Sequence, residues 1–396
     1  MATADSIFDI PAPSTPRAPG LLVLLATMPL EQLEGVLANL TSSYPAESLI
    51  VATADAVPTD SWPSLRVVPI PAAVASWTLT ATDFVNAYQL AGENDARAIL
   101  VLGAGAASLR PSVLRELANA VIAASTDLAI PCYDLPPHAG LANSAILYPL
   151  TRALFASRAR FPLAIDLGLS LRMAERLAVA GQRFTTANQG TALLWPANEA
   201  AVAGFVVNEF SVGPREIPQP AESDINAILA SVTGSLFSDI DAKAAFWQRP
   251  RQVPPARYPV HQAPTADAAP DIGSMLDAFH LAYANLQEIW SLVLPPNSLL
   301  GLKRLSATNA ATFRMPDGLW VRIVFDFLLA YRLRTINRGH LLGALIPLYL
   351  AWVASHFNIT ASGTAPERHI EAVAATFEAD KPYLVSRWRW PDRFNP

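Results

Sequence analysis

Short apolar runs alternate with amphipathic segments through the first half of the chain. The clearest run, Ala98 to Leu102, is followed at once by Gly103 to Ser108, which contains only glycine, alanine and one serine. An apolar run without alternation is typical of a strand buried on both faces of a parallel sheet. We therefore predict a central strand over 99–102, with Gly103 to Ser108 at the carboxyl edge, where open α/β sheets bind ligands.

The same pattern repeats on both sides of this strand. Regular alternation of strand and amphipathic helix is typical of βαβ units, and it predicts a right-handed parallel sheet. Thr82 or Asp83 is expected near the cap position of the second helix. The predicted strands cover 21–26, 48–52, 65–70 and 127–131, and the predicted helices cover 29–40, 82–92, 111–124 and 171–180.

The second half of the chain has a different pattern. The segment 248–271 is rich in Pro, Ala and Gln and reads as a linker, while 275–290, 320–335 and 340–357 have helical apolar spacing. We therefore predict a lead-in over 1–20, an α/β domain over 21–247, the linker, and a helical domain over 272–396. The aromatic tail from Trp388 to Phe394 is expected to dock on this helical domain.

Composition limits the classes of function. The chain has 396 residues, 52% hydrophobic and 15% charged, with a net charge of −5. No basic tract could neutralise a phosphate backbone, which argues against nucleic acid as a partner. Cys132 is the only cysteine, so neither an intrachain disulfide nor a cysteine-rich metal site is expected.

Two segments bear on the compartment. Residues 1–20 lack the basic start and apolar middle of a signal peptide. The apolar stretch 340–353 contains Pro347 and is shorter than the roughly 20 residues of a bilayer-spanning helix, so it predicts a buried core helix. We expect a cytoplasmic protein with no transmembrane segment.

Several phrases resemble the GT-A class of nucleotide-sugar glycosyltransferases. The likeness is to family-2-type enzymes related to mannosylglycerate synthase and glucosyl-3-phosphoglycerate synthase. It implies a GT-A fold, a mostly parallel Rossmann-like sheet with an α-helical C-terminal extension. The phrases that carry it are Asn143 to Phe155, Arg160 to Ser170, Gly204-Phe205, Val232 to Phe237 and Pro347 to Leu350.

The charged motifs of that family are missing. Its Asp-x-Asp pair, which holds a divalent metal on the donor diphosphate, matches Gly103 and Gly105 here, and we expect these glycines to fill the space of the acidic side chains. The family's metal-binding histidine falls near Ile217, and an acceptor-side aspartate falls near Leu193. No metal site and no cofactor are therefore predicted. Two functions stay open: a metal-independent glycosyltransferase, or a catalytically silent domain that binds a ligand or regulates an active paralogue.

The resemblance places the candidate site residues. Asp166 is the one remaining acid of the family's motif and the candidate catalytic group, although an acid capping the helix over 171–180 is the structural alternative. The structural alternative for Asp55 is a solvated acid in a loop. The loop that carries His138 is expected to lie over the ligand-binding crevice at the carboxyl edge of the sheet. The candidate donor-binding residues are Thr27, Asp55, Gly103 and Gly105, and the candidate acceptor-side residues are His138 and Trp195.

The remaining charged residues indicate structure or partners. No two of the six histidines have metal-ligand spacing on one helix face. Arg322 and Asp326 are expected to form an i,i+4 pair, the alternative being an arginine row, continued by Arg332, Arg334 and Arg338, that faces an anionic acceptor or a partner protein. The expected partners are a nucleotide-sugar and either a second copy or a paralogous glycosyltransferase.

Overall fold

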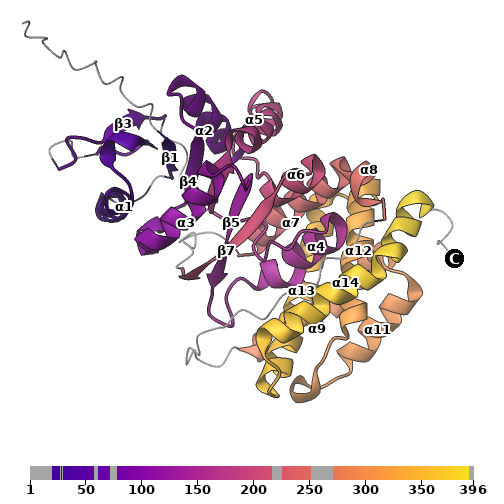
Figure 1. The fold of residues 1–396 in the computed structure, drawn as a ribbon. Coiled ribbons are helices and arrows are strands. Elements are labelled where there is room, and N and C mark those ends of the chain that lie inside the picture. Colours follow the sequence, from indigo (N-terminus) through magenta and orange to yellow (C-terminus); the bar gives the residue numbers. More distant parts are fainter. Residues whose placement is uncertain are drawn as a thin grey trace, which may run out of the picture.

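A sheet of seven described strands forms one half of the molecule (Figure 1). The computed structural model describes residues 20–26, 28, 30–57, 61–71, 78–215, 225–250 and 271–391. The strand order is β3-β2-β1-β4-β6-β5-β7. The strands are β1 (Leu21–Leu25), β2 (Leu49–Thr53), β3 (Arg66–Pro69), β4 (Ala98–Leu102), β5 (Leu128–Asp134), β6 (Asp166–Ser170) and β7 (Val207–Pro214).

Strand β4 lies at the centre of the sheet, as predicted. It pairs with β1 on one side and β6 on the other, and all five of its residues are buried. One strand departs from the parallel arrangement that the βαβ pattern predicts, because β6 runs antiparallel to both β4 and β5. The remaining pairs are parallel, so the fold class predicted from the sequence is confirmed: an α/β fold with a mostly parallel sheet and a helical C-terminal region.

Helices cover both faces of the sheet. Figure 1 shows α2 (Ala81–Glu93) and α5 (Leu171–Thr185) packed together on one face, with α1 (Leu30–Ser43) and α3 (Pro111–Ile122) on the other. The predicted cap of α2 is wrong by two residues. Thr80 is the N-cap, and its backbone N–H donates to the Asp83 carboxylate at 2.7 Å in a capping box.

The other half of the molecule is helical, in agreement with the apolar spacing after residue 271. The segment predicted as one helix over 275–290 is two helices that meet at Leu286. The helices are η3 (Asn143–Leu147), α4 (Tyr148–Phe155), α6 (Pro196–Ala203), α7 (Ile225–Ala242), α8 (Ala244–Trp247), α9 (Ile272–Asn285), α10 (Gln287–Val293), α11 (Pro296–Ser306), α12 (Asp317–Leu333), α13 (Arg338–Ala361) and α14 (Pro366–Arg389).

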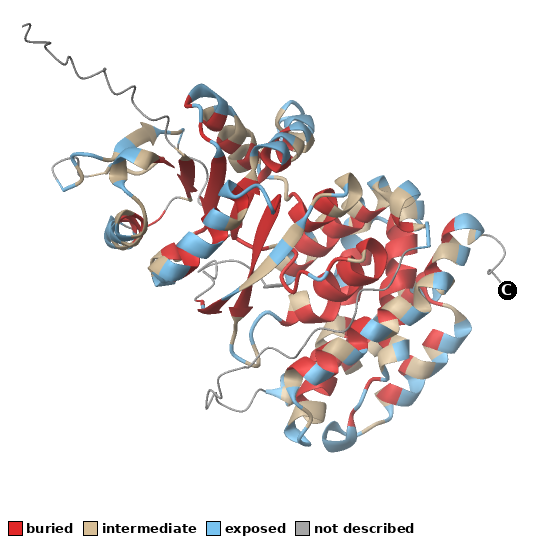
Figure 2. Ribbon diagram, viewed as in Figure 1, coloured by how far each residue is buried: buried red, intermediate tan, exposed pale blue. Residues whose placement is uncertain are grey.

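Buried side chains form two large clusters, seen as the two red regions of Figure 2. One lies around the sheet. The other joins α7 and α9–α14 with η3 and α4, which the chain inserts between β5 and β6. The second cluster therefore uses residues from both sides of 248–271, a segment that lies mostly outside the described residues. The division into domains stays a prediction, because packing clusters do not show which parts fold independently.

Two expectations about the helical half are met. The predicted core helix is α13, which is long and apolar enough to cross a membrane, although 61% of its most apolar window is buried in the protein. The start of the tail docks as expected: Trp388 is 3% exposed, and its ring lies 4.9 Å from that of Trp247, edge to face, whereas Trp390 is 57% exposed. Residues 392–394 of the predicted tail lie outside the described residues.

Candidate functional site

The candidate site lies where β4 ends and β6 begins. Because β6 is antiparallel, its first residue, Asp166, is the register partner of Leu102, the last residue of β4. The Gly103 backbone N–H donates to Asp166 Oδ1 at 3.2 Å. The structure thus brings together two predicted site residues, one from the donor set and the candidate catalytic acid.

Arg215, a residue that the sequence did not indicate, occupies this edge of the sheet. It follows directly after β7, and its Nε donates to Asp166 Oδ2 at 3.0 Å while its Nη2 donates to Oδ1 at 3.1 Å. The same Nη2 donates to the Ala104 carbonyl at 3.0 Å. Both side chains are 0% exposed. The candidate catalytic acid is therefore the buried half of a bidentate ion pair.

Tyr133 completes the set of donors around Asp166. Its hydroxyl donates to Asp166 Oδ2 at 3.1 Å and accepts from the Ile165 backbone N–H at 3.3 Å. Burial, together with the negative charge of Asp166, raises the pKa of Tyr133 well above its ordinary value, so the phenol stays a donor. A buried carboxylate is costly unless its lone pairs are satisfied, and Asp166 meets this condition with donors from three residues.

Asp166 does not cap α5, the structural alternative considered from the sequence. Ser170 is the N-cap, and its side chain accepts from the Met173 backbone N–H. Asp166 is the first residue of β6 and Ser170 is the last, so Asp166 lies at the other end of the strand from this cap.

Gly103 is in close contact with the loop that precedes β6. A Cβ placed on Gly103 would lie 2.8 Å from Ile165 Cβ and 3.0 Å from the Ile165 carbonyl oxygen. The expectation that this glycine fills space left by an acidic side chain is therefore wrong, because no such space exists at this residue. Gly105 has φ of +78°, a left-handed conformation that favours glycine.

These residues do not fit the divalent metal that the family resemblance implies. Hard cations need several free oxygen ligands, but both oxygens of Asp166 accept hydrogen bonds from the protein. In the described ranges, no group of three His, Cys, Asp or Glu side chains could hold a metal ion. The guanidinium of Arg215 supplies the positive charge at this edge instead.

Asp55, the other described donor-side residue, binds the backbone of the same edge. Its Oδ2 accepts from the Met28 N–H at 3.0 Å, which ties the segment after β2 to the segment after β1. Thr27 lies outside the described residues. The structure thus gives Asp55 a local structural role, and a donor-binding role for either residue stays a prediction.

The two acceptor-side candidates lie apart from each other. Trp195 is 1% exposed in the helical cluster, and its indole N–H donates to Ser235 Oγ at 3.1 Å. His138 lies in the loop after β5, with its ring 4.7 Å from that of Phe357, edge to face. His138 thus contacts α13, and neither residue's acceptor role is tested by these contacts.

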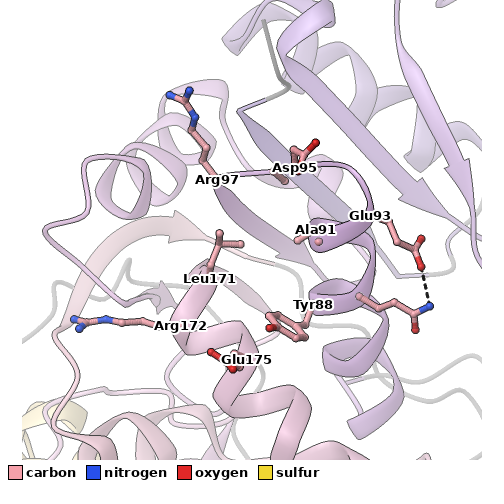
Figure 3. A pocket seen from close by; sticks show the side chains of 11 residues that line it. Tyr88, Ala91, Glu93, Asp95, Arg97, Leu171, Arg172 and Glu175 are labelled. Atoms are coloured by element: carbon pink, nitrogen blue, oxygen red, sulfur yellow. Dashed lines mark hydrogen bonds between the residues drawn. The ribbon is translucent and has the colours of Figure 1, made fainter.

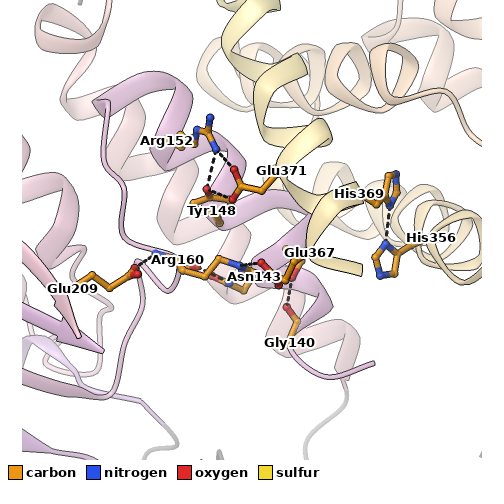
Figure 4. Close-up of polar contacts among 11 residues, drawn as sticks. Gly140, Asn143, Tyr148, Arg152, Arg160, Glu209, His356, Glu367, His369 and Glu371 are labelled. Atoms are coloured by element: carbon orange, nitrogen blue, oxygen red, sulfur yellow. Dashed lines mark hydrogen bonds and ion pairs between the residues drawn. The ribbon is translucent and has the colours of Figure 1, made fainter. Parts of the chain in front are cut away.

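A buried polar network joins α4 to α14 (Figure 4). Arg152 donates to Glu371 at 2.5 Å and to Glu378 at 2.9 Å, and Arg160 donates to Glu367 at 2.8 Å. Between Glu367 and Glu371 on α14, His369 Nδ1 lies 2.7 Å from Nδ1 of His356. The sequence analysis did not predict this network. Each arginine lies more than 200 positions from its glutamate partners, whereas the two histidines are closer in the sequence.

The expected pair of Arg322 with Asp326 does not form. Arg322 Nε donates to Asp380 Oδ2 at 2.6 Å, and Asp326 Oδ1 accepts from Arg387 at 2.9 Å. Both partners belong to α14, so packing of that helix on α12 overrides the local pairing. Arg332 donates to the Trp388 carbonyl at 2.7 Å and Arg338 donates to the Tyr331 carbonyl, which ties the arginine row into the helical half.

One hollow in the described part of the molecule, shown in Figure 3, lies away from the candidate site. It has a volume of about 880 Å³ and lies between the end of α2 and the start of α5, beside Arg97 and Arg172. Arg97 precedes β4, so this groove is at the amino edge of that strand, opposite Gly103. Its lining mixes acidic and basic side chains and gives no convergent chemistry.

The buried His356 predicts a loss of stability in acid. Burial, reinforced by the nearby histidines, lowers the pKa of His356 from 6.5 to about 3. Below pH 6.5, His356 therefore binds a proton in the unfolded chain but stays neutral in the folded chain. The free energy of unfolding falls by about 1.4 kcal/mol for each pH unit. From pH 7 to pH 5 this one group should cost about 2 kcal/mol.

Urea unfolding of His356→Phe across this pH range checks the prediction. The difference between wild type and variant should shrink toward acid pH, whereas His340→Phe, an exposed position on the same helix, should leave the profile unchanged. Burial raises the pKa of Asp326 to about 6, but this group titrates equally in all three proteins. A constant difference between pH 7 and pH 5 would contradict the assignment.

Comparisons with known proteins give no family. No family model and no curated protein match this chain. Among solved structures, glucosyl-3-phosphoglycerate synthase from Mycobacterium tuberculosis, in complex with Mn²⁺, UDP-glucose and phosphoglyceric acid, is 14% identical with a TM-score of 0.38, over 55% of this chain and 79% of that chain. A mycobacterial protein is 13% identical with a TM-score of 0.38, over 55% and 74% of the two chains. Likeness at this level does not assign the chain to a family.

Proposed function

We propose that this protein is a glycosyltransferase-like protein whose α/β half is catalytically silent. It would serve as a binding or regulatory partner of an active paralogous glycosyltransferase. The phrases Asn143 to Phe155 and Arg160 to Ser170 carry the resemblance to nucleotide-sugar enzymes. The observation that supports the proposed lack of catalysis is the bidentate ion pair of Asp166 with Arg215, which is 0% exposed at the end of β4.

The chemistry of sugar transfer explains why this pair matters. Loss of a nucleoside diphosphate develops negative charge on the leaving phosphates, and a metal ion or a free cationic side chain must stabilise that charge. Arg215 has the required charge, but its Nε and Nη2 donate to Asp166 and to the Ala104 carbonyl. A diphosphate could recruit this guanidinium only by leaving a buried carboxylate unpaired, which is strongly unfavourable.

Binding and transfer assays test the proposal. Calorimetric titrations with UDP-, GDP- and ADP-sugars, with and without manganese, should show no manganese-dependent heat. Mass spectrometry should detect no sugar transfer to candidate acceptors by the protein alone. Robust transfer without metal would instead establish the active, metal-independent enzyme and refute the silent one.

The regulatory role has its own test. A paralogue with the same layout and an intact Asp-x-Asp pair should change its rate of transfer when this protein is added in equimolar amount. Arg215→Met is compared in the same assay, because the substitution lies at the edge of the sheet and outside the helical cluster. An unchanged paralogue rate, together with no co-elution in gel filtration, would remove the regulatory role.

A further inference from the structure

Strand β7 forms one edge of the described sheet, because β5 is its only neighbour in the strand order. It has eight residues, and proline occurs only at its last position, Pro214. The other edge strand, β3, has four residues and also ends in a proline, Pro69. The backbone N–H and C=O groups of an edge strand can pair with another chain unless something blocks them. The longer edge, β7, is therefore the one that is open to such pairing.

The register with β5 shows which backbone groups of β7 point outward. Leu128 is the register partner of Val207, and the Leu128 N–H donates to the Val206 carbonyl at 3.1 Å. Because alternate residues of a strand bond to a parallel neighbour, the Val206 carbonyl and the Asn208 N–H are directed to β5. The N–H and C=O of Val207 therefore point away from the sheet, and no described residue forms a hydrogen bond with them. Ser211 has the same phase farther along β7.

A groove of about 640 Å³ lies against the first three residues of β7. Residues 155–159, at the end of α4 and just after it, form its other wall, and Ala197 and Ala201 of α6 form its floor. Four alanines line this wall and floor, so a larger apolar side chain finds room between them. The volume is within the range of about 300–1,000 Å³ that is typical of ligand pockets.

The wall excludes a second copy of β7 as the occupant. The Arg160 N–H donates to Glu209 Oε2 at 2.6 Å, which holds the wall segment close to β7. The edge of β7 in a second copy would be faced by its own wall in the same way, so two whole sheets could not meet here. A single extended chain is slender enough to enter the groove beside Val207.

The charges around the groove favour a neutral occupant. Its lining contains one acid, Glu209, and one base, Arg158, and therefore has no net charge. The Phe155 carbonyl, at the last position of α4, accepts no hydrogen bond from a described residue. The groove thus has backbone donors and acceptors on one wall and an acceptor on the other. A peptide backbone complements both walls, because it carries N–H and C=O groups along its length.

We propose that β7 binds an extended, uncharged apolar segment of a partner protein, which adds to the sheet at Val207. About three residues of the segment fit beside Val207 to Glu209, because both chains rise by about 3.3 Å per residue. The backbone of the segment pairs with the N–H and C=O of Val207, and one of its side chains packs on Ala197 and Ala201. This inference goes beyond the proposed function, because Val207 lies at the other end of β7 from Arg215.

A blocked tripeptide, acetyl-valyl-leucyl-valinamide, tests the inference on the full-length protein. The peptide should shift the backbone amide resonance of Val207 in a saturable way. The same peptide methylated at its amide nitrogens keeps the side chains but cannot donate a hydrogen bond, so it should bind at least about tenfold more weakly. Equal binding of the two peptides would show that only apolar contact is involved and would overturn strand addition, as would no binding of the unmethylated peptide.

A matched pair of variants locates the site. Val207→Pro removes an outward N–H at the first residue of an edge strand, where proline is tolerated, and should weaken binding about five- to tenfold. Ser211→Pro removes an outward N–H of the same strand beyond the groove and should bind the peptide like wild type. The same affinity in both variants would contradict the assignment.

A third variant keeps the proposal testable if Val207→Pro does not fold. Ala201→Phe places a ring in the groove from the half-buried face of α6 and leaves β7 unchanged. This variant should lose measurable binding of the tripeptide, because the floor on which the peptide side chain packs is filled. Binding at the wild-type affinity would overturn the proposal.

Discussion

Replacing Arg215 with methionine is expected to lower the free energy of unfolding by about 3–5 kcal/mol. The variant keeps the volume of the side chain but leaves Asp166, which is 0% exposed, as a buried charge with no cation beside it. Urea unfolding measures the loss. Arg183→Met, at an exposed position of α5, is the control and should stay within about 0.5 kcal/mol of wild type.

A second variant separates the lost charge from lost packing. Asp166→Asn combined with Arg215→Met removes both charges; the amide oxygen can still accept from the Gly103 N–H, while the amide NH2 takes the place of the oxygen that accepts from the Tyr133 hydroxyl. This double variant should be more stable than Arg215→Met alone. If the two proteins unfold at the same urea concentration, the ion pair is not what holds this edge of the sheet together.

Replacing Gly103 with aspartate is expected to destabilise the protein by about 4 kcal/mol or more. The new Cβ would lie 2.8 Å from Ile165 Cβ, and the new carboxylate would be buried beside Asp166. Thermal unfolding measures the effect. Gly92→Ala, in α2 with nothing within 4 Å of the added Cβ, should instead be neutral or stabilise by up to about 1 kcal/mol.

The response of this variant to manganese completes the test. Adding Gly105→Asp restores the family's acidic pair in sequence, yet manganese should not rescue stability or sugar transfer, because the clash with Ile165 remains. Groups that act together in catalysis also recover little when only part of the set returns. Turnover gained by the double variant would show that loss of the metal ligands was the single defect.

The sheet was largely predictable because its buried strands are continuous apolar runs. The predicted strand over 21–26 is Leu21–Leu25, and the one over 48–52 is Leu49–Thr53. The direction of β6 was not predictable. Its five residues pair with β4, and two of them also pair with β5, the preceding strand in the chain; a strand's local pattern carries no information on its direction.

The candidate site was predictable only in part. Asp166 and Gly103 were identified through motif resemblance, and the structure joins them by one hydrogen bond. Arg215 was not identified, because it is 49 positions from Asp166 and stands two residues before Ile217, where the resemblance placed a histidine. A basic residue close to the position where the resemblance places a metal ligand was the one available signal, since a guanidinium can supply positive charge there.

The helical half was predicted in outline but not in its polar contacts. Its long apolar helices α12 and α13 have the expected spacing, whereas α14 is rich in charge and was not predicted as a helix of its own; only its end, from Trp388, belongs to the tail that was expected to dock. Its acids pair with Arg152, Arg160 and Arg322, which lie on other elements. Local i,i+4 rules could not find these partners, because they are set by tertiary packing.

The measurement that tests the central claim most directly is anomalous scattering from crystals soaked in manganese and UDP-glucose. If Arg215 has replaced the metal, no manganese peak should lie within coordination distance of Asp166, Gly103 or Gly105, and the Asp166–Arg215 distances should be unchanged. A well-occupied peak on the Asp166 carboxylate, with the Arg215 guanidinium turned away, would contradict the account.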